Sequence, residues 1–309
     1  MENKKNESIH EKVQDYYGKQ LEKCQAHLLP IFRRLKTITG TLEAVQEKLE
    51  HHAKKYTKTL PSWIEIIVES ASVIPNLEVL IRESVKDMNL EITGHWGYPI
   101  LMFPSSGGKY TQNFDFGLNS SVSKFVEEGR VKLYNIESID MLSFYDDDMP
   151  SEIKIHNYEL YMQFIQTELI PYIQNECNTD RIGVAGVSFG GFHASNTAFR
   201  FPDLVSHLFS MSGVYNIRNF VPDSEDMRVY FNCPDEFMVN EEGWKYNHMN
   251  IVLSTSDQDS CKPKNLNMAG ILDAKGIDYW YDEKKWINHD WPLWKMVFPE
   301  YLERYFPQS

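Results

Sequence analysis

The sequence of 309 residues lacks long hydrophobic runs and has few cysteines. No stretch of eighteen apolar residues occurs, and residues 1–7 are charged with no apolar segment after them. We therefore expect neither a membrane-spanning helix nor a secretory signal. The four cysteines are scattered with no C-x-x-C pair, so they indicate neither a zinc cage nor a disulfide framework. These absences together favour a protein of the reducing cytoplasm.

The sequence also lacks an excess of basic residues. Lys and Arg number 31 against 44 Asp and Glu, which gives a formal net charge of −13. Residues 1–85 carry 13 basic and 12 acidic residues, so the net negative charge comes entirely from the remainder. A surface of this sign repels nucleic acid and anionic lipid, so we expect neither as a partner.

The N-terminal part of the chain, residues 1–75, has the pattern of a helical extension. Apolar residues between positions 28 and 49 recur at intervals of three and four, which predicts one long helix. A shorter helix is predicted over residues 62–73, and Pro75 then breaks the pattern. The apolar stripe must be buried, either in cis or against a second chain, so a homo-oligomer formed through these helices is one expectation. The stripe consists of Leu28, Ile31, Leu35, Ile38, Leu42, Val45 and Leu49.

The remainder, residues 76–309, alternates short β-like runs with amphipathic helical segments. Such alternation predicts one domain with a mostly parallel sheet and helices on both faces. Strands are expected at 77–81, 88–93, 98–103, 131–136, 182–186, 208–211, 250–255 and 278–282, with helices at 158–174, 191–200 and 266–274.

A G-x-S-x-G motif joins a predicted strand to a predicted helix at residues 186–190. A serine on such a tight turn has strained dihedrals and crowded neighbours, and glycines two positions before and after it relieve the clash. Gly186 and Gly190 occupy those positions around Ser188. The motif in this context predicts a nucleophilic serine and the α/β-hydrolase fold. The alternative is a glycine-rich turn that only packs a helix on a strand.

In this fold the triad residues follow in the order serine, acid, histidine. His289 follows the last predicted strand and precedes the final helix, so we expect it to be the general base. The segment after the strand at 250–255 offers two carboxylates, and Asp259 is preferred over Asp257 as the acid that orients His289. The other histidines considered precede the last strand and are expected to lie at the surface or to support the site: His95, His156, His193 and His248.

Two backbone amides are expected to form an oxyanion hole. One is that of Phe189, at the start of the helix that follows the nucleophile. The other should come from the loop after the strand at 98–103, here called the oxyanion loop, residues 104–108. Gly107 is the predicted donor, because small residues let this backbone approach a substrate closely.

Five short segments have the form of family motifs: F-P-S-S-G-G at 103–108, G-V-S-F-G-G at 186–191, M-S-G-V-Y at 211–215, Y-F-N-x-P at 230–234 and H-D-W-P-x-W at 289–294. Together they resemble a family of bacterial-type esterases with the α/β-hydrolase fold, similar to the esterase D group. The resemblance covers roughly residues 86–309 and implies Ser188 and His289 as nucleophile and base. It places the acid at Asp259, although Ser256 replaces the usual glycine of that turn.

The predicted function is hydrolysis of a carboxylic ester or thioester, a small-molecule substrate, through an acyl-serine intermediate. This chemistry needs no cofactor, and no metal site is expected. Transfer of the acyl group to an acceptor uses the same residues and stays open as an alternative. A catalytically silent interaction protein that uses its helical arm is the alternative from another class, and an intact Ser188, Asp259 and His289 argues against it.

Overall fold

The computed structural model describes residues 88–222 and 224–308. The predicted N-terminal helices, the domain boundary at residue 75, the strand at 77–81 and an oligomer built on the helices lie outside the described residues. They stay predictions. No helix within the described ranges is long and apolar enough to cross a bilayer.

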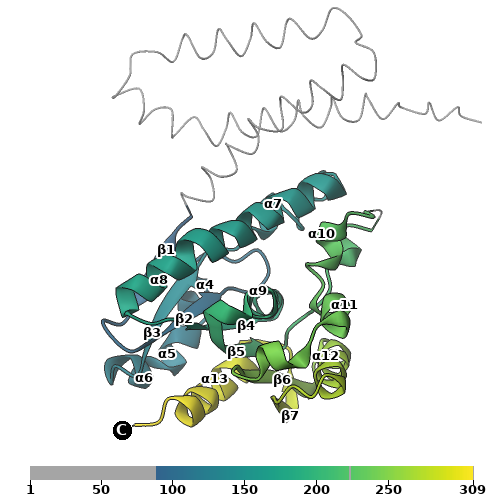
Figure 1. Ribbon diagram of the computed structural model, residues 1–309. Helices are drawn as coiled ribbons and strands as arrows, with labels where there is room; N and C mark the ends of the chain where they lie inside the picture. The colour runs from purple at the N-terminus through teal and green to yellow at the C-terminus, as the bar shows by residue number, and fades with distance from the viewer. Residues whose placement is uncertain (1–87, 223, 309) are drawn as a thin grey trace, which may run out of the picture. The chain divides into compact units, whose positions relative to one another are not determined.

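The centre of the fold is a seven-stranded sheet in the order β1-β3-β2-β4-β5-β6-β7 (Figure 1). Only β1, at one edge, is antiparallel to its neighbour, so the predicted mostly parallel sheet is confirmed. The strands are β1 Leu90–Thr93, β2 Tyr98–Phe103, β3 Val131–Ile136, β4 Ile182–Val187, β5 Val205–Met211, β6 Asn250–Gln258 and β7 Trp280–Asn288.

Helices cover both faces of this sheet, because alternate strand residues point to opposite sides. In β2, Ile100 and Met102 join the apolar cluster that includes residues of α5, α6 and α13. Leu101 and Phe103 join the larger cluster on the opposite face, which includes residues of α7, α8, α9 and α12. The helices are α4 Gln112–Asp115, α5 Leu118–Ser121, α6 Ser123–Glu127, α7 Ser151–Phe164, α8 Ile170–Cys177, α9 Phe189–Arg200, α10 Met227–Tyr230, α11 Pro234–Phe237, α12 Lys262–Ala274 and α13 Trp291–Tyr305.

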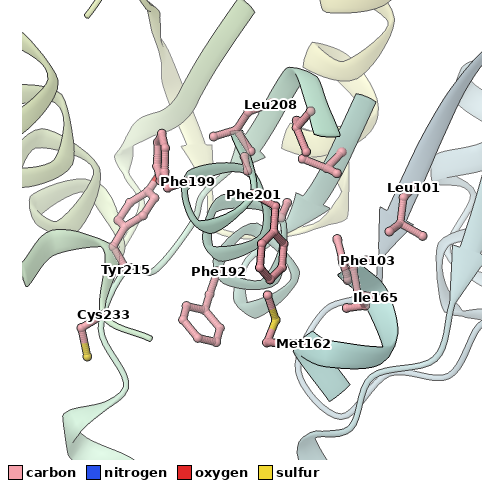
Figure 2. Close-up of a cluster of buried hydrophobic side chains, with 14 of the residues drawn as sticks. Leu101, Phe103, Met162, Ile165, Phe192, Phe199, Phe201, Leu208, Tyr215 and Cys233 are labelled. Atoms are coloured by element: carbon pink, nitrogen blue, oxygen red, sulfur yellow. The ribbon is translucent and has the colours of Figure 1, made fainter. Parts of the chain in front are cut away.

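Helix α9 lies at the middle of the larger cluster, and Figure 2 shows the side chains around it. Phe192 and Phe199 project from α9, Phe103 comes from β2, and Met162 belongs to α7. All four are at most 2% exposed. The helix that begins at the nucleophile is therefore fixed on its apolar side by dense packing.

The helix predicted over 158–174 begins seven residues earlier and is interrupted. Helix α7 starts at Ser151, after Pro150 in an extended conformation, and a π-helical turn over Ile165–Leu169 joins it to α8. The apolar period of the first turns is hidden by charged residues such as Lys154, which is nonetheless buried. Burial here is set by neighbouring elements and not by local periodicity.

Candidate active site

Ser188 lies at the sharp turn between β4 and α9, with φ +57° and ψ −119°. A non-glycine residue at such angles is strained and persists only when its surroundings hold it. The two glycines of the motif supply the space. A Cβ on Gly186 would lie 2.0 Å from the carbonyl oxygen of Gly190, and one on Gly190 would lie 2.2 Å from that of Pro104. The chain can form this turn because glycine, which has no Cβ, occupies both positions; a larger residue would clash with the backbone.

The structure brings together the three residues that the sequence singled out as a triad. The Nε2 atom of His289 lies 2.9 Å from Oγ of Ser188, and its Nδ1 atom lies 2.8 Å from Oδ1 of Asp259. Asp259 follows β6 and His289 follows β7, so both stand at the carboxyl ends of parallel strands, on the same edge of the sheet as the end of β4. The arrangement has the geometry of a nucleophile, a base and a group that orients the base.

Burial and hydrogen bonding set the charges of the pair. Burial raises the pKa of Asp259, but its hydrogen bonds, first of all that with His289, outweigh this and leave the pKa below the usual value. Burial lowers the pKa of His289, but the bond to Asp259 and the negative charge beside it raise the pKa to about 9. Asp259 is thus held as a carboxylate, with an oxygen directed at the imidazole.

Asp257, the other candidate acid, lies in a different environment. Its Oδ1 atom accepts a hydrogen bond from the backbone amide of Trp286 at 2.8 Å. Trp286 has a positive φ of +60° and is 83% exposed, so this bond supports a strained position in β7. No hydrogen bond joins Asp257 to His289 among the described residues.

The oxyanion loop lies against the elbow, as the contact between Gly190 and Pro104 shows. The amide of Gly107, the predicted donor, points elsewhere: it donates to Oδ2 of Asp140 at 2.7 Å. Of the amides at residues 105–108, that of Ser106 has no partner among the described residues. The N–H of Gly107 is thus engaged by Asp140 in this structure, and the N–H of Ser106 is the open one. The amide of Phe189 stands at the first position of α9, as expected.

Two residues that the sequence did not single out, Trp294 and Ser212, lie beside His289: Trp294 contacts its ring, and Ser212 binds Trp294. Trp294 presents its ring edge-on to His289, with centroids 5.2 Å apart, and its Nε1 donates to Oγ of Ser212 at 2.9 Å. Ser212 is buried and has a positive φ of +55°. The motifs H-D-W-P-x-W and M-S-G-V-Y contain both residues, so the signal was present in the segments that carried the family resemblance.

His193 was expected at the surface or in a supporting position, and the surface alternative is wrong. Its side chain is fully buried, and Nε2 lies 2.9 Å from Oδ1 of Asp140, which is also fully buried. Nothing in the local sequence around either residue indicated this pair.

A partly exposed aromatic pair lies near His289. Phe116 stacks on Trp291 at 4.7 Å between centroids and 11° between planes, and Trp291 in turn contacts Trp294. Phe116 is 50% exposed, although aromatic rings are usually buried. This surface consists of rings from two segments and lies two ring contacts away from His289.

One group in the described part of the chain has the residue types of a metal site. Single ligand atoms of Asp259, Cys261 and His289 lie within 4.8 Å of one another. The Asp259 and His289 atoms that a metal would take already form the hydrogen bond of the triad. This hydrogen bond accounts for the close approach of the two side chains, and we assign no metal to the group.

The parallel sheet, the strained serine and its hydrogen-bonded histidine define an α/β-hydrolase. The chain belongs to the esterase family whose model, described as "Putative esterase", matches residues 125–304. It is an esterase-like enzyme. A second family model, described as "Type 5 capsule protein repressor C-terminal domain", matches residues 31–95, and most of these lie outside the described residues. The search of curated proteins gives no match.

Solved structures share the fold at low sequence identity. A ferulic acid esterase is 18% identical with a TM-score of 0.55 and covers 69% of this chain and 85% of its own. The fluorophosphonate-binding serine hydrolase F of Staphylococcus aureus is 13% identical with a TM-score of 0.57 over 72% and 93%. An S-formylglutathione hydrolase from Agrobacterium tumefaciens is 13% identical with a TM-score of 0.54 over 70% and 88%.

Proposed function

We propose that this enzyme cleaves a carboxylic ester or thioester through an acyl-serine intermediate, with Ser188 as nucleophile, His289 as general base and Asp259 as the orienting acid. The observation that carries the proposal is the continuous hydrogen-bonded line from the serine hydroxyl through the imidazole to a buried carboxylate. A surface histidine that only packs in an aromatic loop would not need both partners.

In the first half-reaction Oγ of Ser188 attacks the substrate carbonyl and its proton passes to Nε2 of His289. Collapse of the tetrahedral intermediate expels the alcohol or thiol, which takes that proton. In the second half-reaction Nε2 removes a proton from water, the hydroxide attacks the acyl carbonyl, and the acid leaves as Oγ recovers its proton. Asp259 stabilises the imidazolium that exists during both steps.

The negative oxygen of each tetrahedral intermediate needs hydrogen-bond donors. The amide of Phe189 is one, since it begins a helix whose N-terminus carries partial positive charge. The amide of Ser106 takes the second place in this proposal, because it is the open amide of the oxyanion loop. The pair replaces the combination of Phe189 with Gly107 expected from sequence.

Similar solved structures include an esterase and an S-formylglutathione hydrolase, which supports esters and thioesters as the first substrate classes to test. Acyl transfer to an alcohol or thiol acceptor would use the same residues. Product analysis with a labelled ester and an added acceptor separates the two reactions, because transfer moves the label to the acceptor and hydrolysis releases it as acid.

The decisive experiment is labelling with a fluorophosphonate probe at neutral pH, followed by mapping of the modified residue. We expect labelling of Ser188 in the full-length wild type, none in Ser188→Ala, and a large loss of rate in His289→Ala. Ser195→Ala is the matched control, because Ser195 is fully buried within α9 and should not alter labelling. A folded wild type that reacts with neither probe nor esters would overturn the proposal and favour a silent interaction protein.

A further inference from the structure

The oxyanion loop connects to α9 through a buried carboxylate that the proposed mechanism does not use. Asp140 stands in the 3-10 turn Asp140–Leu142, between β3 and α7, and is fully buried. Its Oδ2 atom accepts the Gly107 amide at 2.7 Å, and its Oδ1 atom lies 2.9 Å from Nε2 of His193. One side chain thus links three segments that are distant in the sequence: the loop, the turn and the nucleophile helix.

The hydrogen-bond partners of His193 determine which ring nitrogen carries the proton. Nδ1 of His193 lies 3.1 Å from the hydroxyl of Tyr158. Burial raises the pKa of Tyr158 well above its ordinary value, so this phenol keeps its proton and can donate it to Nδ1. Nε2 then carries the hydrogen and donates to Asp140. The carboxylate therefore receives one donor on each oxygen, as a buried charge requires.

The hydrogen bond of Gly107 determines which other backbone amides of the oxyanion loop stay open. Gly107 has φ +61°, a left-handed conformation that turns the chain sharply. With this amide turned to Asp140, the amide of Ser106 stays open while its hydroxyl accepts a hydrogen bond from Tyr145 at 2.9 Å. The remaining amides are engaged within the loop region, Ser105 N with Gln112 Oε1 at 2.7 Å and Gly108 N with Ser105 O at 2.9 Å.

We propose that Asp140 and His193 are positioning residues for catalysis, which hold the Gly107 amide so that the Ser106 amide faces the developing oxyanion. The inference rests on the proposed function, because it assigns the geometry of that same site. Neither residue touches substrate. Their contribution is realised only as charge develops on the carbonyl oxygen, so it belongs to kcat and not to KM.

The first test is substitution of Asp140 followed by steady-state kinetics on an activated ester. Loss of an oxyanion donor costs about 10²- to 10³-fold in kcat, so a displaced donor in Asp140→Ala should cost about 10- to 100-fold with KM within about twofold. Affinity for a boronic acid, which mimics the tetrahedral intermediate, should fall by the same factor as kcat/KM. The acidic limb of the pH profile, set by His289, should not move.

Asp140→Asn should restore the kcat that Asp140→Ala loses, because the asparagine side chain can make both hydrogen bonds of Asp140. Its single carbonyl oxygen still accepts the Gly107 amide, and its NH₂ group donates to Nε2 once His193 shifts its proton to Nδ1 and donates to Tyr158. We expect kcat within about threefold of the wild type. The matched control is Asp226→Ala, which removes a hydrogen-bonded carboxylate at the N-cap of α10 and should leave kcat and boronic acid affinity unchanged.

A second measurement on the unsubstituted protein remains decisive if Asp140→Ala does not fold. In amide NMR spectra the Gly107 N–H should exchange slowly and stay in place when the boronic acid binds, whereas the Ser106 N–H should shift downfield. A shift at Gly107 in place of Ser106 overturns the inference, as does a folded Asp140→Ala with wild-type kcat. Failure of the proposed function would show differently, because the wild type itself would then not react at Ser188.

Discussion

The Oδ1 atom of Asp259 lies 2.8 Å from Nδ1 of His289 and also accepts the backbone amide of Cys261 at 2.7 Å. The backbone amide of Cys261, in the turn that contains Asp259, therefore fixes the carboxylate in the position from which it orients the imidazole. Asp257 lies only two residues away but makes neither of these contacts. Its carboxylate accepts the backbone amide of Trp286.

This difference separates the two candidate acids in an experiment. We expect Asp259→Asn to lower kcat by about 10³- to 10⁴-fold, because an amide favours the wrong tautomer of His289. Asp257→Asn should retain activity within a few-fold, since its oxygen can still accept the Trp286 amide. Steady-state kinetics of both variants on one ester provide the comparison, and the opposite ranking would assign the acid to Asp257.

The activity should depend on the protonation of His289. The base must be neutral to accept a proton, and its pKa of about 9 means that the neutral fraction grows as the pH rises. We expect kcat/KM to increase about tenfold per pH unit in the acidic range and to level off near pH 9. Asp259→Asn removes the charge that raises this pKa, so the limb should move to lower pH. An unmoved limb would mean that another group controls it.

Substitution of the motif glycines should disrupt the elbow. Gly190→Ala places a Cβ 2.2 Å from the oxygen of Pro104 and 2.7 Å from that of Phe103, both backbone atoms that cannot turn aside. We expect the free energy of unfolding to fall by about 1–3 kcal/mol. Fluorophosphonate labelling should be lost as well. Gly270→Ala in α12 meets nothing within 4 Å and should gain about 0.5–1 kcal/mol. Chemical denaturation of both variants measures the contrast.

The aromatic pair near the base should contribute to substrate binding. Phe116→Ala removes one ring of the stack with Trp291, and we expect KM for aryl or long-chain esters to rise about 3- to 10-fold, with little change for acetyl esters. Trp244→Ala is the control, because Trp244 is also exposed, at 69%, but lies in the turn Gly243–Tyr246. Equal effects on all acyl groups would argue against an acyl or aryl subsite here.

Stability should fall in mild acid because of His207. Burial lowers the pKa of this residue from 6.5 to about 4, so between these values the unfolded chain binds a proton that the folded protein does not. The stabilisation is present above pH 6.5 and is lost as the pH falls toward 4, by about 1–2 kcal/mol at pH 5. Urea unfolding at pH 7 and pH 5 should show a smaller loss in His207→Phe, whose ring fits beside Phe209 and Phe306.

Much of the fold follows from local pattern. The strands at 98–103 and 131–136 have the predicted bounds, because each is a short β-like run whose residues are almost all buried on both faces. The start of α7 was missed, since its first turns mix charges with apolar residues and depend on packing for their burial. Apolar periodicity in the sequence predicts poorly the bounds of a helix whose burial depends on tertiary packing.

The sequence by itself determined the position and surroundings of Ser188, since a G-x-S-x-G turn is a local steric requirement, and it determined the order of the candidate triad along the strands. Only the tertiary structure placed Asp259, and not Asp257, in hydrogen-bond contact with His289 and turned the Gly107 amide toward Asp140. The pairing of Asp140 with His193 was likewise invisible, because the two residues are 53 positions apart. Contacts of this kind depend on how separate segments pack, and no periodicity in the chain encodes which oxygen a given amide will meet.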